Sequence, residues 1–314
     1  MNFQPTEGQA AILDALARVI APYRTIDHST VVQRTIYATE LERTLQSAGF
    51  FELENDAESA VTAALVVAEI ACLPVCVEIN ASLLVRPLVC PQARGPLAII
   101  NGDELRPTRF LPQARTALLL QGDQVRMLEL QPGDVEEVTS LFAYPVGRLK
   151  PGVAARATPL PASAATQLRR TWRIGVALEI YGALHTASAI TIEHVTQRRQ
   201  FGKPLGSMQA IQHRLAMNAT TIEAIRWLAL KAASSRSVRD AAIASSYAQP
   251  AVATIAYDVH QFSGAMGMTL EYPLHLYTYR ARMLQSELGG GRAQIEDAVT
   301  AIWNSATDNV IQPA

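Results

Sequence analysis

Residues 198–205 read Arg-Arg-Gln-Phe-Gly-Lys-Pro-Leu, a short polar turn between two long helical patterns. Residues 163–197 before it contain few helix breakers, and residues 208–235, 238–265 and 294–303 after it repeat apolar side chains at helical spacing. Four helices of this kind with short connections predict an antiparallel bundle. Pro250 lies inside the third helix and predicts a kink or break there, because proline cannot donate the helical hydrogen bond.

The chain before the bundle shows two kinds of sequence pattern. Residues 9–22, 36–48 and 57–72 have helical apolar spacing, which predicts a small N-terminal helical domain. Prolines then separate β-prone runs at 83–85, 97–100 and 117–120, which predict strands of a reduced β domain. The expected fold is therefore mainly α with a small β domain, divided into residues 1–81 (helical), 82–150 (β) and 151–314 (helical bundle).

Composition excludes several classes of function. The 27 basic and 28 acidic side chains nearly cancel, so the chain lacks the basic surface that nucleic-acid binding requires. Cys72, Cys76 and Cys90 form no even disulfide framework, and neither they nor the six histidines show metal-site spacing. No apolar run reaches about 18 residues, and the N-terminus has no basic leader. We expect a cytoplasmic protein with reduced cysteines, packing or surface histidines, no metal and no membrane span.

Two motifs carry a family resemblance. Arg198, Phe201 and Gly202 resemble the R-x-x-F-G signature of the acyl-CoA dehydrogenases, and residues 209–216 resemble its Q-x-x-Q and L-A continuation. Residues 261–267, Gln-Phe-Ser-Gly-Ala-Met-Gly, are similar to the family's Q-x-x-G-G-x-G and precede an E-Y-P at residues 271–273, with Ala265 replacing the second glycine. The resemblance implies an acyl-CoA dehydrogenase-like fold, FAD as cofactor and dehydrogenation of an acyl-CoA thioester.

The residue types of these motifs suit a dinucleotide. An arginine can hold a pyrophosphate through two hydrogen bonds, and a phenylalanine offers an apolar face to a purine. Glycines let backbone amides approach a phosphate closely. In the family's dimers both motifs hold the adenosine end of the neighbouring subunit's flavin. The resemblance therefore assigns cofactor binding to Arg198, Phe201, Gln261, Gly264, Ala265 and Gly267.

A simpler interpretation of the same residues stays open. In it, Arg198 pairs with a surface acid, Phe201 belongs to the core, and the glycines only end a helix.

The catalytic glutamate that the resemblance implies is missing. In most members it precedes a glycine in the loop after E-Y-P, where this chain has Leu288 or Gly290, according to the alignment. In other members it lies on the long bundle helix, where this chain has Trp172. Glu287 is one residue out of register, and one residue turns a helical side chain by about 100°. We expect it to be a solvated loop side chain, although the glycines at 289–291 leave open a remodelled loop with Glu287 as base.

The β segment also lacks the family's flavin-ring motifs, T-E-P-x-x-G-S-D and W-I-T. The leading hypothesis is a non-catalytic-type subunit of an α2β2 acyl-CoA dehydrogenase. A related subunit would bind most of the acyl-CoA and the flavin ring, FAD would be shared, and electrons would leave to an electron-transfer flavoprotein-type acceptor. Resemblance to shortened subunits of bacterial steroid side-chain degradation implies a steroid-CoA substrate. The alternatives are a self-sufficient homo-oligomer with Glu287 as base, and a flavin-free scaffold subunit.

Overall fold

The computed structural model describes residues 4–52 and 57–310 of the chain. Its N-terminal part is helical, as predicted, and a capping box starts it: Thr6 Oγ1 accepts from Gln9 N (3.3 Å) and Gln9 Oε1 accepts from Thr6 N (3.1 Å). The elements are α1 (Glu7–Ile20), η1 (Ala21–Tyr23), α2 (His28–Val31), α3 (Thr39–Ser47) and α4 (Ala57–Ala71). Helix α4 packs on two bundle helices, so the N-terminal helices and the bundle share one apolar core.

The strand predicted at 83–85 is wrong, because those residues form the helical turn η2 (Ala81–Val85), which continues into α5 (Arg86–Val89). The buried carboxylate of Glu78 explains the difference. It accepts hydrogen bonds from Ala81 N (2.7 Å) and from the Ser82 hydroxyl, which satisfies donors at the start of the turn. A local β propensity is therefore overridden by a buried polar contact.

The β part contains two sheets. The strands predicted at 97–100 and 117–120 are confirmed: Leu97 of β1 pairs with Thr116 of β3 in a parallel ladder. One sheet has the order β1-β3-β4-β7 and the other β2-β6-β5. The strands are β1 (Leu97–Asn101), β2 (Thr108–Arg109), β3 (Thr116–Gln121), β4 (Gln124–Glu129), β5 (Val135–Val138), β6 (Val146–Leu149) and β7 (Thr158–Pro159), with η3 (Val153–Arg156) before the last.

The C-terminal part is a helical bundle. Its helices are α6 (Ala164–Gln197), α7 (Gln209–Ser235), α8 (Val238–Ser263), α9 (Leu274–Leu284) and α10 (Gly290–Val310). Short elements connect them: the hairpin β8 (Arg199–Gln200) and β9 (Lys203–Pro204), then η4 (Leu205–Ser207), η5 (Met266–Met268) and η6 (Glu287–Gly289). Four helices were predicted here, and α9 is an additional one.

The sequence predicts a kink or break at Pro250; helix α8 continues through it, so a break is wrong and a kink stays a prediction. Packing of α8 against α6, α7 and α10 offsets the lost backbone hydrogen bond. The start of α10 lies directly on the proline ring, since a Cβ on Gly291 would be 3.2 Å from Pro250 Cγ. Gln249, one residue earlier, donates to the carbonyl of Leu284 beyond the ring (3.1 Å) and thereby ties α8 to the end of α9.

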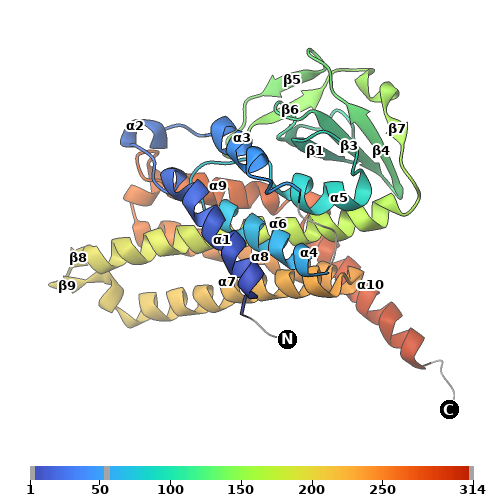
Figure 1. Ribbon diagram of the computed structural model, residues 1–314. Helices are drawn as coiled ribbons and strands as arrows, with labels where there is room; N and C mark the ends of the chain where they lie inside the picture. The colour runs from blue at the N-terminus through green and yellow to red at the C-terminus, as the bar shows by residue number, and fades with distance from the viewer. Residues whose placement is uncertain (1–3, 53–56, 311–314) are drawn as a thin grey trace.

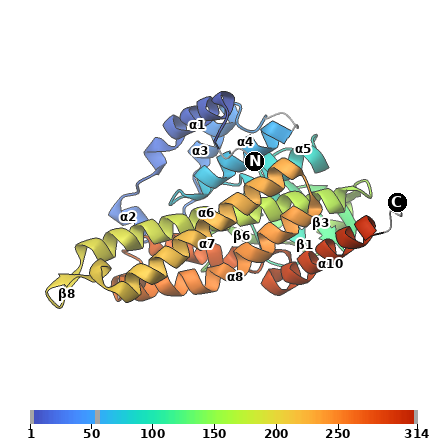
Figure 2. The same ribbon diagram turned by 90° about the horizontal axis from the view of Figure 1, so that it is seen from below.

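The β sheets lie over one end of the bundle, and the β8–β9 hairpin projects from the opposite end (Figure 1). Helices α6, α7 and α8 run alongside one another, with the N-terminal helices on one side (Figure 2). In the described part of the chain, no helix combines the length and apolar composition needed to cross a bilayer. The domain limits at 81/82 and 150/151 remain a prediction.

Candidate functional site

The two positions where the resemblance implies a catalytic glutamate meet in space. Trp172 of α6 and Leu288 of η6 line one small cavity of about 40 Å³, together with Glu287. Trp172 is 2% exposed, so its indole fills the space at this point. Neither residue can accept a proton as a carboxylate does, and Glu287 is the acid that remains.

Glu287 is turned into the protein, so the expectation of a solvated loop side chain is wrong. Its side chain is 14% exposed and accepts from Arg109 Nε at 3.2 Å. The loop is remodelled around it: Leu288 has φ 57°, and Gly289 and Gly290 have φ 89° and 81°. Gln249 of α8 donates to the Glu287 carbonyl at 2.8 Å. This local left-handed backbone accompanies the inward turn of Glu287.

Arg109 is the centre of a buried charge cluster. It comes from β2 and donates from Nη1 and Nη2 to the two carboxylate oxygens of Glu179 on α6, at 2.7 and 2.8 Å. Its guanidinium also lies 5.2 Å from the ring centres of Phe110 and Tyr144. Burial by itself lowers the pKa of Arg109, but Glu179 and Glu287 raise it above its ordinary value, so the guanidinium stays charged. Burial raises the pKa of Glu287, and Arg109 partly opposes this rise.

Further polar side chains fill the space around Arg109 between the β part and α6, which we call the closed cleft. Asn80 donates to Glu179 Oε2 at 2.9 Å, and it fits because α6 has a glycine opposite: a Cβ on Gly175 would lie 1.8 Å from Asn80 Oδ1. Glu78 is fully enclosed beside them, and burial raises its pKa. The cavity that these residues line with Arg109 is about 20 Å³. Ligand pockets typically measure about 300–1,000 Å³, so the residues present do not fit an isoalloxazine ring.

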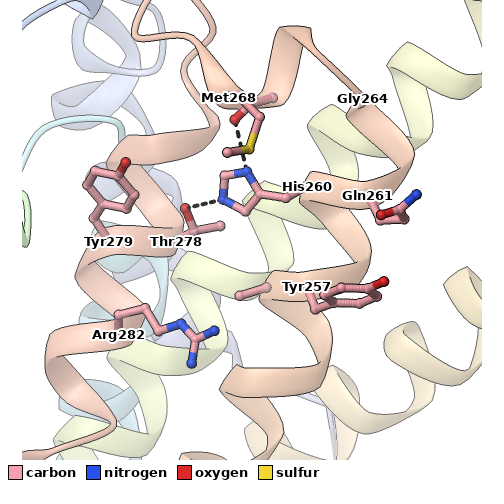
Figure 3. A pocket seen from close by; sticks show the side chains of 10 residues that line it. Tyr257, His260, Gln261, Gly264, Met268, Thr278, Tyr279 and Arg282 are labelled. Carbon is pink, nitrogen blue, oxygen red and sulfur yellow. Dashed lines mark hydrogen bonds between the residues drawn. The ribbon is translucent and has the colours of Figure 1, made fainter.

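A pocket of about 530 Å³ lies elsewhere, between α8 and α9 (Figure 3). Three of the motif residues line it: Gln261, Gly264 and Gly267. The rest of the lining was not singled out from the sequence, because isolated residues on two helices form no recognisable motif. It consists of Ala256, Tyr257, His260, Met268, Thr278, Tyr279 and Arg282.

The glycine positions of the motif have different physical roles. Gly264 has φ 59° and ψ −141°, a conformation that is essentially restricted to glycine, and a Cβ there would meet no atom within 4 Å. Gly267 packs against the end of α8, since its Cβ would be 2.8 Å from Ser263 Cβ. Ala265 has φ −59° and ψ −34°, so an alanine in place of the family's second glycine brings no backbone strain. The Gly264 turn thus leaves its backbone open toward the pocket.

Arg198 and Phe201 lie on the hairpin side of the same end of the bundle. Phe201 is 87% exposed with φ 54°, so it is not a core residue. Arg198 caps α6, and among the described residues it takes part in no ion pair. The hydroxyls of Thr191 on α6 and Ser263 on α8 are 3.5 Å apart, so the two helices that lead into the motifs are in contact there. Arg198 lies about 10 Å further along α6 and does not line the α8–α9 pocket.

The described residues contain no group of His, Cys, Asp or Glu side chains arranged to hold a metal ion. The sequence does not reveal the cluster around Arg109, because its members lie on β2, α6 and η6, far apart along the chain. Of its three charged members, the sequence points to Glu287 alone, through the expected carboxylate positions.

Residues 163–301 match the model of the acyl-CoA dehydrogenase C-terminal domain family. Acyl-CoA dehydrogenase IpdE2 of Mycobacterium tuberculosis is 33% identical over 135 residues, which are 43% of this chain and 42% of that protein. A chain of the ChsE4-ChsE5 complex from Mycobacterium tuberculosis superimposes with TM-score 0.78 at 18% identity, covering 100% of both chains. A variant of the Tcur3481-Tcur3483 steroid ACAD superimposes with TM-score 0.76 at 19% identity, covering 96% of this chain and 99% of that chain. The chain therefore has the acyl-CoA dehydrogenase fold, and its residues 163–301 are similar to the C-terminal domain of that family.

Proposed function

We propose that this chain is the non-catalytic-type subunit of a heteromeric FAD-dependent acyl-CoA dehydrogenase, and that it completes the flavin site of a related partner subunit. One contrast carries the proposal. The cleft under the β sheets is filled by side chains around Arg109, whereas the pocket at the adenosine-side motif is open. A chain that binds the flavin ring and acyl group itself would need the cleft around Arg109 to be open as well.

The closed cleft supports an inactive isolated chain. Removal of an α-proton needs a carboxylate free to accept it above the thioester. Leu288, Gly290 and Trp172 occupy the family's carboxylate positions, and the Glu287 carboxylate is held by Arg109 at 3.2 Å. The oxidation of the CH–CH bond, typical of the family, would then take place on the partner's flavin with the partner's base.

The open pocket supports a contribution to FAD in trans. Its Gln261 side chain, its glycine turn at Gly264 and its aromatic wall suit an adenosine diphosphate better than a flavin ring. Arg198 and Phe201 present a cation and an exposed aromatic ring at the same end of the bundle. The FAD that these residues would hold is the redox cofactor, and this chain would retain only its adenosine end.

The comparisons suggest the partner and substrate. The ChsE4-ChsE5 complex has two named components, and the Tcur3481-Tcur3483 protein is described as a steroid ACAD. By analogy we assign this chain to an α2β2 heterotetramer that acts on a steroid side-chain CoA thioester held mainly by the partner. An electron-transfer flavoprotein-type acceptor would reoxidise the flavin.

The test is flavin retention in the complex with a related acyl-CoA dehydrogenase subunit. Arg198→Ala should weaken retention about 10- to 150-fold, the equivalent of one charge-assisted hydrogen bond. Arg292→Ala, on the exposed face of α10, serves as the matched control and should leave retention unchanged. The flavin-to-protein ratio is measured after dialysis at matched thermal stability. Equal flavin occupancy in both variants and in Gln261→Ala would favour the scaffold function instead.

The self-sufficient alternative has one observation in its favour: burial raises the pKa of Glu287, as general bases often require. Dye-linked turnover of an acyl-CoA by the isolated chain, abolished by Glu287→Gln, would establish that alternative.

A further inference from the structure

We infer that Arg282 binds the diphosphate of an adenosine diphosphate group in the α8–α9 pocket, and that His260 of the same pocket takes up a proton when this anion binds. The inference rests on the proposed function for the class of ligand. It adds one binding residue outside the family motifs, Arg282, and a dependence of binding on pH through His260.

Arg282 is a cation for which the described residues provide no carboxylate partner. It extends from α9 into the space between α9 and α8 (Figure 3). Its Nη1 donates to Gln285 Oε1 at 3.1 Å, and the described residues offer it no ion pair. The other groups of this guanidinium remain available at the surface of the pocket. A diphosphate would supply the missing negative charge and accept from them in pairs.

His260 has hydrogen-bond partners that suit both of its protonation states. Its Nδ1 lies 2.9 Å from the Gly267 carbonyl, so this nitrogen carries a proton and donates it. Its Nε2 lies 3.0 Å from Thr278 Oγ1, which is itself 3.1 Å from the Leu274 carbonyl. In neutral His260, the Thr278 hydroxyl donates to Nε2. In the cation, Nε2–H donates to the hydroxyl, which turns to the Leu274 carbonyl, so a second proton leaves no polar group unsatisfied.

The surroundings favour neutral His260 while the pocket holds no anion. Burial lowers the pKa of His260, and the hydrogen bond to the Gly267 carbonyl raises it. Positive charge on Arg282 and His275 of α9 adds to the lowering of this pKa. The phenols of Tyr257 and Tyr279 are the other titratable groups of the pocket wall, and residues 264–269 carry none. An anion beside Arg282 cancels the repulsion and raises the pKa of His260. Binding therefore takes up a proton and weakens as pH rises.

The walls of the pocket fit the rest of an adenosine diphosphate. Tyr257 and Tyr279 offer rings for stacking, and Ala256 and Met268 add apolar surface. The volume of about 530 Å³ lies within the range of small-molecule sites, about 300–1,000 Å³. Both FAD and coenzyme A contain an adenosine diphosphate, so either can be its source.

The experiment titrates the full-length chain with ADP by calorimetry between pH 6 and 8, in buffers of different ionisation enthalpy. We expect proton uptake on binding and an affinity that falls as pH rises, by at most about tenfold per pH unit. Arg282→Gln should weaken ADP binding about 10- to 150-fold, and the control Arg292→Gln should not. His260→Asn keeps a donor for the Gly267 carbonyl but cannot gain charge, so its affinity should be independent of pH.

Absence of ADP binding, equal affinity of Arg282→Gln and wild type, or unchanged pH dependence in His260→Asn would each overturn the inference. Competition with FAD and with coenzyme A identifies the source, and preference for FAD agrees with a flavin held in trans. Circular dichroism melting of each variant keeps loss of folding separate from loss of binding. If flavin retention in the complex depends on Arg198 but not on Arg282, this inference fails and the proposed function stands.

Discussion

Arg109→Met should destabilise the chain strongly, because it removes the cation that holds two buried carboxylates. Glu179 and Glu287 have side chains only 6% and 14% exposed, and Arg109 donates to them at 2.7, 2.8 and 3.2 Å. Methionine keeps most of the apolar stem but leaves both acids without a counter-charge. Breaking a buried ion pair by removing one partner typically costs about 3–5 kcal/mol, and we expect a loss in that range.

The assay is equilibrium unfolding in urea at neutral pH, followed by circular dichroism. The triple variant Arg109→Met, Glu179→Gln, Glu287→Gln should recover much of the loss, because amides have no charge to bury. Arg126→Met is the matched control: its ion pair with Glu104 is 26% and 41% exposed, so the change should cost at most about 1 kcal/mol. If Arg109→Met costs no more than Arg126→Met, the ion cluster does not hold the cleft closed, and that reasoning is refuted.

Three further predictions concern single positions. Burial raises the pKa of Glu287 in the folded state, so its contribution to stability is present below its unfolded pKa of about 4.3 and is lost as pH rises through the folded pKa. Urea unfolding should therefore show wild type losing stability relative to Glu287→Gln as pH rises through that window. Gly175→Ala should lower the free energy of unfolding by about 1–3 kcal/mol, because the added methyl overpacks on Asn80, whereas Gly8→Ala on α1 should be neutral or stabilising. Equal changes in melting temperature for the two variants would contradict this. Gly264→Ala should cost about 1–3 kcal/mol through backbone strain alone, since its Cβ meets no neighbour, and a melting temperature equal to wild type would disprove that strain.

Periodicity and turn chemistry predicted much of the fold because they are local properties of the chain. The long helical pattern at 163–197 and the apolar run at 97–100 became α6 and β1. The failures depend on contacts that the apolar pattern does not register. Residues 83–85 turn helical because the buried Glu78 carboxylate accepts from Ala81 N and the Ser82 hydroxyl at the start of the turn, a local contact of a buried acid. Helix α8 continues through Pro250 because three helices pack around it, which is a tertiary contact.

The candidate site divides in the same way. The motif at 261–267 predicted one wall of the α8–α9 pocket, because its glycines and glutamine are adjacent in sequence. The opposite wall with Arg282 comes from α9, a helix that was not predicted. In the closed cleft, the sequence predicts Glu287 as a solvated loop side chain, and this is wrong because its partner Arg109 lies 178 residues away. Long-range pairing of charges leaves no periodic signal in a single sequence.

The central claim is tested most directly by the flavin content of the purified chain, alone and in complex with a related acyl-CoA dehydrogenase subunit. Absorbance near the flavin band, measured against protein concentration after dialysis, gives the occupancy. The closed cleft at Arg109 and the open pocket at Gly264 predict colourless protein alone and stable flavin only when the partner is present. A tightly bound flavin in the isolated chain, reduced by an acyl-CoA, would contradict the account.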